Sequence, residues 1–313
     1  MLRRPAPEGH LADALGDLVG LDPDHAVVET AAGRTQVDLA AVVAAKVVEP
    51  ATPDQLALEL VAAQGWRSRE TAWSSDGWLL RADGGVTRRA NSALALRTPK
   101  RPLPEAVAAT RAWYAERGLP LTIALPLPAR SLLDGGLEEY CGLVGDVATD
   151  THVFAARLDH LLATNAPSDV AVVLGPETSP EWRAVDKPEY AHDEVVTALF
   201  ARHDDVVFAS VYSGDEIVAI GRAVVDAAVP GRHGGTPERW LGITGLAVAP
   251  DIRRRGLARA VLRALWQWGV TQGATRSYLQ VASGNQAAIR LYLTAGYWHH
   301  HDYRYRWDPQ DTL

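Results

Sequence analysis

The sequence has little cysteine and no long apolar run. Cys141 is the only cysteine among 313 residues, which excludes an intrachain disulfide and a metal site built from several thiolates. No apolar run approaches the roughly 20 residues that a helix needs to span a bilayer, and the first residues lack the apolar core of a secretory signal. We therefore expect a cytoplasmic protein with no membrane partner.

Lysine is scarce too, because Lys46, Lys100 and Lys187 are the only lysines among 31 basic residues. Acidic residues number 38, and the formal net charge of -7 argues against a general nucleic-acid binder, which would carry a basic surface. Hydrophobic residues make up 47% of the chain and charged residues 22%, as in folded globular proteins. We expect a folded protein of two or three domains without a nucleic-acid partner.

The segment Leu246–Ala258 predicts a strand, a tight turn and the start of a helix. Its apolar part ends at Pro250, Arg253–Arg255 and Gly256 form the turn, and apolar residues recur at helical spacing from Leu257 onward. The first amides of a helix have no partner inside the helix and are partly positive, so a glycine here lets an anion approach the backbone. The turn predicts a phosphate site, although an ordinary turn with a solvated basic cap would have the same residues.

A second pattern follows at residues 276–297. Residues 276–283 predict a strand, and Asn285 begins a helix that Gly296 ends. The two patterns together resemble the GNAT superfamily of N-acetyltransferases. Its motifs are matched by Arg253, Gly256 and Ala258 and by Asn285, Ala288, Leu291, Tyr292, Gly296 and Tyr297. The resemblance covers residues 168–313.

The resemblance implies acetyl-CoA as co-substrate, bound where two parallel strands separate. The gap would lie between the strand that ends at Val248 and the strand 276–283. The implied binding residues are Leu246, Ala247, Val248, Ala249, Arg253, Arg254, Arg255, Gly256, Leu257, Ala258, Arg259, Asn285 and Tyr292. Asn285 is explained equally well as the cap of its helix.

Two catalytic groups follow from the resemblance, the backbone amide of Ala247 and the phenol of Tyr292. Attack on a thioester builds negative charge on its oxygen, and a fixed N–H at Ala247, or within one residue of it, would stabilise that charge. Tyr292 would protonate the leaving thiolate. The general base stays open, because Thr244 is the only polar side chain of the strand 240–247. Water, an amine that arrives neutral, or one of Glu238, His192 and Asp193 could take the proton.

The acceptor is predicted only as a primary amine of a small molecule, a peptide or a protein. Residues 181–205 carry seven acidic and three basic residues, which would attract an ammonium group or form a solvated helix face. His299, His300 and His301 alternate along a predicted strand, so the three rings cannot share one face. We therefore predict no metal site.

We predict an α/β protein with a mixed sheet, and we divide the chain into three domains. Residues 1–50 resemble a small SH3-like β module, 54–165 a degenerate GNAT-like domain, and 168–313 the catalytic domain. The second and third parts share the order strand, strand, helix, strand, helix, strand. The counterpart of the phosphate turn, Arg97–Pro104, has three prolines and no glycine. Because proline has no amide donor, we expect a single co-substrate site.

The predicted reaction is direct acetyl transfer within a ternary complex, because Cys141 lies outside 168–313 and no other residue suggests a covalent carrier. Two alternatives stay open. One is a non-catalytic acyl-CoA-binding regulatory module, which the missing base and the N-terminal module allow. The other is a tandem acetyltransferase similar to mycothiol synthase. The sequence leaves the oligomeric state open.

Overall fold

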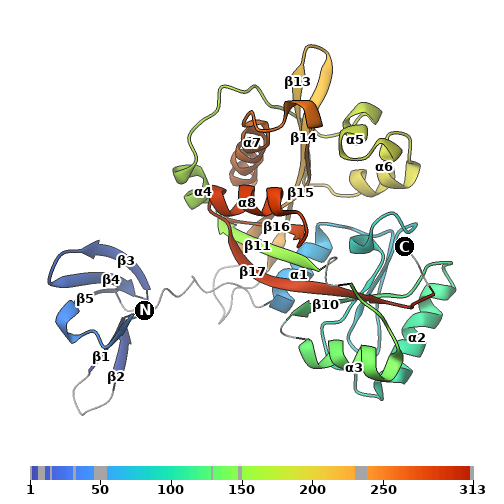
Figure 1. The fold of residues 1–313 in the computed structure, drawn as a ribbon, viewed down its shortest axis with the longest axis horizontal. Helices are drawn as coiled ribbons and strands as arrows, with labels where there is room; N and C mark the ends of the chain where they lie inside the picture. Colours follow the sequence, from blue (N-terminus) through green and yellow to red (C-terminus); the bar gives the residue numbers. More distant parts are fainter. Residues whose placement is uncertain are drawn as a thin grey trace. The chain divides into compact units, whose positions relative to one another are not determined.

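The computed structural model describes residues 2–5, 11–14, 16–30, 33–45, 55–127, 130–146, 150–229 and 238–310. The chain forms two compact units, Met1–Thr52 and Pro53–Leu313 (Figure 1). The expected boundary near residues 50–54 lies outside the described residues.

The first unit contains two three-stranded sheets. One is β2-β1-β6, with β1 Leu2–Pro5, β2 Leu11–Ala14 and β6 Ala44–Ala45. The other is β3-β4-β5, with β3 Gly16–Leu21, β4 His25–Thr30 and β5 Gly33–Asp38. β-Forming residues and turn residues of the sequence predict strands at 14–21, 26–30 and 34–38, which match β3, β4 and β5. β1 is not predicted, because its two arginines and proline interrupt the alternation. The SH3-like assignment stays a prediction.

The second unit is built on one 11-stranded sheet in the order β12-β13-β14-β15-β16-β11-β17-β10-β9-β8-β7. In chain order its strands are β7 Glu70–Trp73, β8 Leu79–Ala82, β9 Ala93–Leu94, β10 Thr122–Leu127, β11 Thr151–Arg157, β12 Val173–Gly175, β13 Val206–Ser213, β14 Glu216–Val229, β15 Glu238–Val248, β16 Arg276–Ala282 and β17 Trp298–Trp307. Its helices are α1 Gln55–Gln64, α2 Leu103–Ala115, α3 Ser131–Cys141, α4 Leu158–Thr164, α5 Pro180–Asp186, α6 Glu194–Ala201, α7 Leu257–Thr271 and α8 Gln286–Ala295.

A pair of parallel strands connected by a helix occurs twice in this sheet. In the first half β9 and β10 pair in parallel and α2 connects them. In the second half β15 and β16 pair in parallel and α7 connects them. The tandem α/β architecture expected from the sequence is confirmed.

The two halves exchange their last strands. β11, from the first half, pairs with β16 along its whole length, from Thr151 opposite Ala282 to Arg157 opposite Arg276. β17, from the second half, pairs with β10 and also with β11, and Figure 1 shows it crossing both halves. The expected division between residues 165 and 168 stays a prediction, and hydrogen bonds cross it in both directions.

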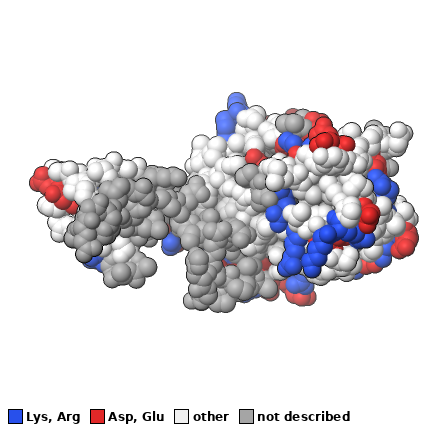
Figure 2. Space-filling view, turned by 90° about the horizontal axis from the view of Figure 1, so that it is seen from below, with Lys and Arg blue, Asp and Glu red and all other residues white. Residues whose placement is uncertain are grey.

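Helices cover both faces of the second half (Figure 1). One core cluster holds the apolar side of α7 with Leu279 and Val281 of β16. On the other face α1 packs on Trp240 and Tyr278, and α5 and α6 enclose Phe208. No helix in the described ranges is long and apolar enough to cross a membrane. On the face drawn in Figure 2, acidic and basic side chains of this unit lie interspersed.

Candidate active site

The strands β15 and β16 separate halfway along their length. Their parallel pairing runs from Trp240 opposite Arg276 to Ile243 opposite Leu279, whereas β15 continues to Val248 and β16 to Ala282. Gly245, with φ +60, lies where the register of β14 and β15 shifts. This positive φ favours glycine, and the irregularity turns the end of β15 away from β16. The sheet therefore has a gap after residue 243.

Backbone groups of β15 point into this gap. The amide of Ala249 donates to the carbonyl of Val218 in β14 at 2.9 Å. Because successive amides of a strand point to opposite edges, the amide of Ala247 also points to β14, and those of Leu246 and Val248 point to the gap. The carbonyl of Val248 accepts a hydrogen bond from Arg253 Nε at 3.0 Å, as expected for a group without a β14 partner.

The turn after β15 leaves the start of α7 open. Gly256 is the N-cap residue, with φ +81, and no side chain caps the helix. A Cβ on Gly256 would meet no atom within 4 Å. Arg254 has φ +66, the only positive φ of a non-glycine residue in the described ranges; such backbone costs about 1 kcal/mol or more and is typical of functional turns.

A cavity of about 730 Å³, called here the turn cavity, lies between this turn and α8. It is lined by Leu246, Ala247, Val248, Arg253, Arg254, Gly256, Leu257, Ala258, Arg259, Asn285, Ala287, Ala288, Arg290, Leu291, Tyr292 and Thr294. Of the residues expected from the sequence, only Ala249 and Arg255 are not among them. Arg290 also lines the cavity but was not predicted from the sequence. Its only indication was its position one turn after Gln286 on the predicted helix.

Tyr292 is buried, with 7% of its surface exposed. Its ring packs against those of Phe154 and Tyr297. Burial raises the pKa of Tyr292 to about 12, although the charge of Arg89 opposes the shift. The phenol is therefore protonated at neutral pH and can act as a proton donor.

Two polar residues of the turn cavity have partners within the protein. Asn285 Oδ1 accepts the amide of Ala288 at 3.1 Å and so caps α8. Arg259 donates to Asn165 Oδ1 and to Thr294 Oγ1. Both residues thus also hold the walls of the cavity in place.

A second cavity, called here the opposite cavity, has a volume of about 420 Å³. Gln280 lies between Leu279 and Val281, which face α7, so its side chain points to the other face of the sheet. The lining residues are Trp66, Val86, Thr87, Arg88, Arg89, Thr151, Asp186, Lys187, Tyr190, Val196, Leu199, Phe200, Thr244, Gly245, Gln280, Tyr303 and Tyr305. Both halves of the unit contribute lining residues. No sequence motif in the first half predicted this contribution.

The carboxylates of residues 181–205 do not form the negative wall that the sequence suggested. Of the seven acids, only Asp186 lines the opposite cavity. Desolvation raises the pKa of Asp186, although Lys187 opposes the shift, and the residue as a whole stays exposed. Lys187 and two arginines line the same cavity. Among the lining residues cations therefore outnumber the carboxylate.

The three base candidates named from the sequence lie elsewhere. Glu238 pairs with Arg276 at 2.5 Å, at the end of β15 remote from the gap. Asp193 caps α6 by accepting the amides of Val195 and Val196. His192 is exposed and, like the other two, lines neither cavity.

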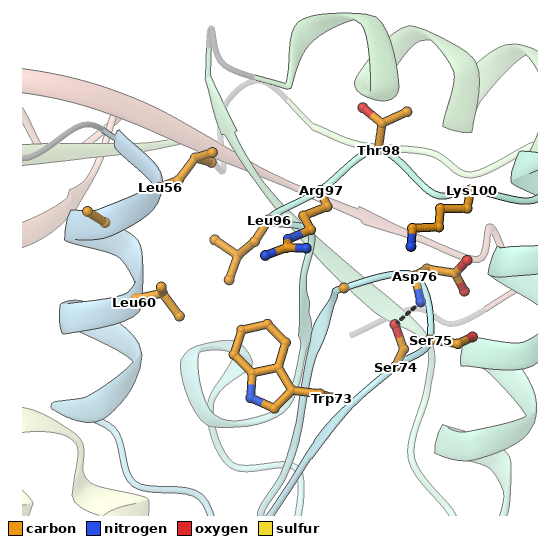
Figure 3. A pocket seen from close by; sticks show the side chains of 12 residues that line it. Leu56, Leu60, Trp73, Ser74, Ser75, Asp76, Leu96, Arg97, Thr98 and Lys100 are labelled. Carbon is orange, nitrogen blue, oxygen red and sulfur yellow. Dashed lines mark hydrogen bonds between the residues drawn. The ribbon is translucent and has the colours of Figure 1, made fainter.

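The first half has a cavity at the corresponding turn (Figure 3). It measures about 640 Å³ and is lined by Leu60, Trp73, Arg97 and Lys100 among others. Side chains of the protein bond the backbone carbonyls that follow β9. Trp78 Nε1 donates to the carbonyl of Arg97 at 2.9 Å, and the Arg130 guanidinium donates to the carbonyl of Leu96. In the second half Arg253 Nε likewise donates to the carbonyl of Val248, whereas the amide of Val248 points into the gap.

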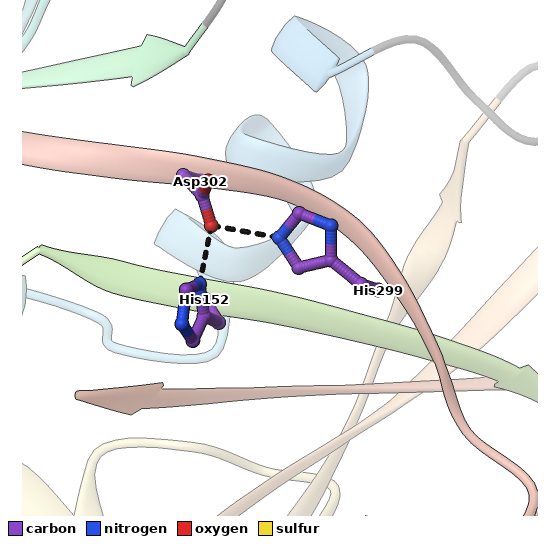
Figure 4. A group of neighbouring side chains, drawn as sticks. All are labelled: His152, His299 and Asp302. Carbon is purple, nitrogen blue, oxygen red and sulfur yellow. Dashed lines mark hydrogen bonds and ion pairs between the residues drawn. The ribbon is translucent and has the colours of Figure 1, made fainter. Parts of the chain in front are cut away.

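A cluster of two imidazoles and a carboxylate joins β11 and β17 (Figure 4). His152 Nδ1 and His299 Nε2 both donate to Asp302 Oδ1, at 2.5 and 2.7 Å. Burial alone would raise the pKa of Asp302, but these donors lower it below its usual value. His301 turns to the other side and bonds Glu59 at 3.1 Å. The alternation expected from the sequence is interrupted here, because the register of β11 and β17 shifts between Val153 and Phe154 and His300 Nδ1 lies 2.8 Å from His301 Nδ1. His299 has two partners that could ligate a metal with it.

Comparison with known proteins adds relatives that span the chain. The family model "Probable histone acetyltransferase Rv0428c C-terminal" matches residues 52–306. The probable histone acetyltransferase Rv0428c of Mycobacterium tuberculosis is 32% identical over 312 residues, which cover 97% of this chain and 91% of that protein. The uncharacterized N-acetyltransferase YobR of Bacillus subtilis is 26% identical over 263 residues, covering 80% and 96% of the two chains.

Two solved structures resemble the fold. A GCN5-related N-acetyltransferase from Kribbella flavida has a TM-score of 0.60 at 19% identity, covering 83% of this chain and 97% of that one. A tandem GNAT protein from the clavulanic acid biosynthesis pathway has a TM-score of 0.52 at 13% identity, covering 82% and 88%. At these identities the likeness shows the fold alone. The family match shows that the chain belongs to the family of the Rv0428c C-terminal region, and is an acetyl-CoA-dependent acyltransferase of the GNAT superfamily.

Proposed function

We propose that the protein transfers the acetyl group of acetyl-CoA directly to a primary amine at the gap between β15 and β16. The observation that carries this proposal is the position of the gap. Leu246 and Val248 beyond it line the turn cavity, and Thr244 and Gln280 beside it line the opposite cavity. A thioester held from one face can then meet an amine held from the other.

The turn cavity fits the co-substrate. The open amides at the start of α7 and the side chains of Arg253, Arg254 and Arg290 would bind its diphosphate. No carboxylate in the described ranges pairs with these three arginines. Amides of β15 would bind the pantetheine arm. The register favours Leu246 or Val248, each one residue from Ala247, as the donor to the thioester oxygen.

In the proposed step the amine nitrogen attacks the thioester carbon, the new C–N bond forms and the C–S bond breaks. Asp186, directly or through water, takes the proton that the amine loses. Tyr292 gives a proton to the thiolate that leaves. Cys141 lies outside both cavities, and burial raises the pKa of its thiol, which disfavours it as a covalent acyl carrier.

Gly256→Glu tests the co-substrate site. The new carboxylate would enter the turn cavity and repel the diphosphate, so we expect acetyl-CoA affinity to fall at least about 100-fold by calorimetry. Gly118→Glu is the matched control, because Gly118 has φ +63 and also has open space around its Cβ. Unchanged affinity in Gly256→Glu would disprove the site.

Turnover separates an enzyme from a regulatory acyl-CoA binder. An enzyme releases CoA when mixed with acetyl-CoA and a suitable amine, whereas a sensor binds acetyl-CoA without release. The relative from Mycobacterium tuberculosis is named a probable histone acetyltransferase, so the amine panel includes lysine-bearing peptides beside small amines.

A further inference from the structure

The opposite cavity is rich in hydrogen-bond donors and positive charge. Arg88, Arg89 and Lys187 line it together with the single carboxylate of Asp186. A cavity built only to receive an ammonium group would have the reverse balance. The excess of positive charge points to a second feature of the acceptor besides its amine.

None of the three cations forms a salt bridge with a carboxylate among the described residues, although the charge of Glu59 acts on Arg89 and that of Asp186 on Arg89 and Lys187. Arg89 Nε donates to the neutral Oε1 of Gln280 at 3.0 Å. Arg88 stacks on the rings of Tyr305 and Trp307, at 5.5 and 4.7 Å, and Lys187 Nζ lies 4.9 Å from the Tyr190 ring. By contrast, Arg304 is neutralised by Asp134 and Asp150.

Two neutral groups in the same wall can also donate to a ligand. Tyr303 is 2% exposed and its hydroxyl lies beside Arg89 and Tyr305, and Trp66 Nε1 has no hydrogen bond within the described residues. A buried donor without an acceptor costs about 1–3 kcal/mol. Both residues line the opposite cavity, so a ligand rich in acceptor oxygens would satisfy them.

We propose that the acceptor is an amine that also carries an oxyanion, a carboxylate or a phosphate. The inference rests on the proposed function. The oxyanion would bind Arg89 and Lys187, with Tyr303 and Trp66 as further donors, while Asp186 meets the amine. Charge-assisted hydrogen bonds of this kind are the strong ones. Binding of the oxyanion would position the amine for attack at the gap.

Matched acceptors test the inference with the full-length protein. ω-Amino acids of increasing length are compared with their own primary amides, and phosphoethanolamine with ethanolamine. We expect kcat/KM for the best anionic acceptor to exceed that of its neutral partner about 10- to 100-fold. Comparison of kcat/KM between the ω-amino acids and phosphoethanolamine distinguishes a carboxylate from a phosphate. Equal or faster acetylation of the neutral partners, or of a lysine peptide without nearby acids, would overturn the inference.

Variants locate the effect. Arg89→Gln and Lys187→Gln should each reduce the ratio of anionic to neutral acceptor toward one, and Arg89→Lys should restore part of it. Arg69→Gln, at an exposed position, and Lys100→Gln, in the cavity of the first half, are the matched controls and should keep the ratio. An unchanged ratio in both test variants would place the oxyanion elsewhere. Since Lys187 is exposed, its variant keeps the test available if Arg89→Gln does not fold.

A binding measurement separates this inference from the proposed function. The N-acetylated product and its amide are titrated into the complex with CoA. Tighter binding of the acidic product than of its amide supports the inference, even if no amine in the panel is acetylated. A lack of acetylation would count against the transferase proposal alone. Equal affinities would overturn the inference while leaving acetyl-CoA binding and CoA release as independent readouts.

Discussion

At the scale of single residues, the conformation of the turn before α7 was the most predictable feature. Gly256 and Arg253 stand in a local motif whose function depends on backbone conformation and spacing, and both are recorded in the sequence. Arg89 was not predictable, because its role depends on contacts with Gln280, 191 residues away. Asp302 was missed for the same reason: its partner His152 comes from the other half of the unit.

Tyr292→Phe removes the proposed proton donor. We expect kcat to fall on the order of 100-fold, with acetyl-CoA affinity within about twofold, because the ring and its packing remain. Tyr297→Phe is the control: its hydroxyl bonds Trp266 and Ser277 at 2.9 and 2.8 Å, so its loss should lower stability by about 1 kcal/mol and leave kcat unaffected. Steady-state kinetics and calorimetry measure both. Full turnover in Tyr292→Phe would remove it from the mechanism.

The elements were predicted well where periodicity was strong and poorly where pairing was distant. α7 and α8 start at the predicted caps, and β15 and β16 occupy the predicted positions. The β-bulge at Gly245 was not predicted, since a glycine in an apolar run gives no sign of the register of its neighbours. The separation of the strands depends on that register.

Gly245→Ala tests how the end of β15 is held. The new Cβ would have ordinary contacts, 3.7 Å from Trp182 and 4.0 Å from Arg222, so the penalty comes from the positive φ and should be about 1 kcal/mol of unfolding free energy. Acetyl transfer should fall as well. Gly135→Ala, within α3 and with no atom nearby, should instead raise stability by up to about 1 kcal/mol. Urea titrations report both, and equal effects would show that the φ at Gly245 carries no strain.

For the whole molecule, alkaline pH should be destabilising. Burial raises the pKa of Tyr114, Tyr278, Tyr292, Tyr297 and Tyr305. In the unfolded chain tyrosine ionises near pH 10, so above about pH 10 the unfolded state releases protons that the folded state keeps, and the free energy of unfolding falls. Burial lowers the pKa of Arg222 to about 10, which acts in the opposite direction, but it is one group against five.

Urea midpoints from about pH 8 to about pH 11 measure this effect, with tyrosinate absorbance followed in parallel. We expect nearly constant midpoints up to about pH 10 and a steady fall beyond it. Constant midpoints through pH 11, or tyrosinate absorbance that rises fully before unfolding, would show that the buried phenols ionise in the folded state.

The tandem arrangement was predictable from the repeated order of elements, but the strand exchange was not. Nothing local in β11 or β17 selects a partner, because both are β-forming segments that could pair in either half of the sheet. The exchange gives each half an interior strand that the other half encodes. A gene for one half alone would encode a sheet with an unpaired edge, which invites aggregation. The two halves therefore depend on one another for a complete sheet, so the first half would stay indispensable even without a co-substrate site of its own.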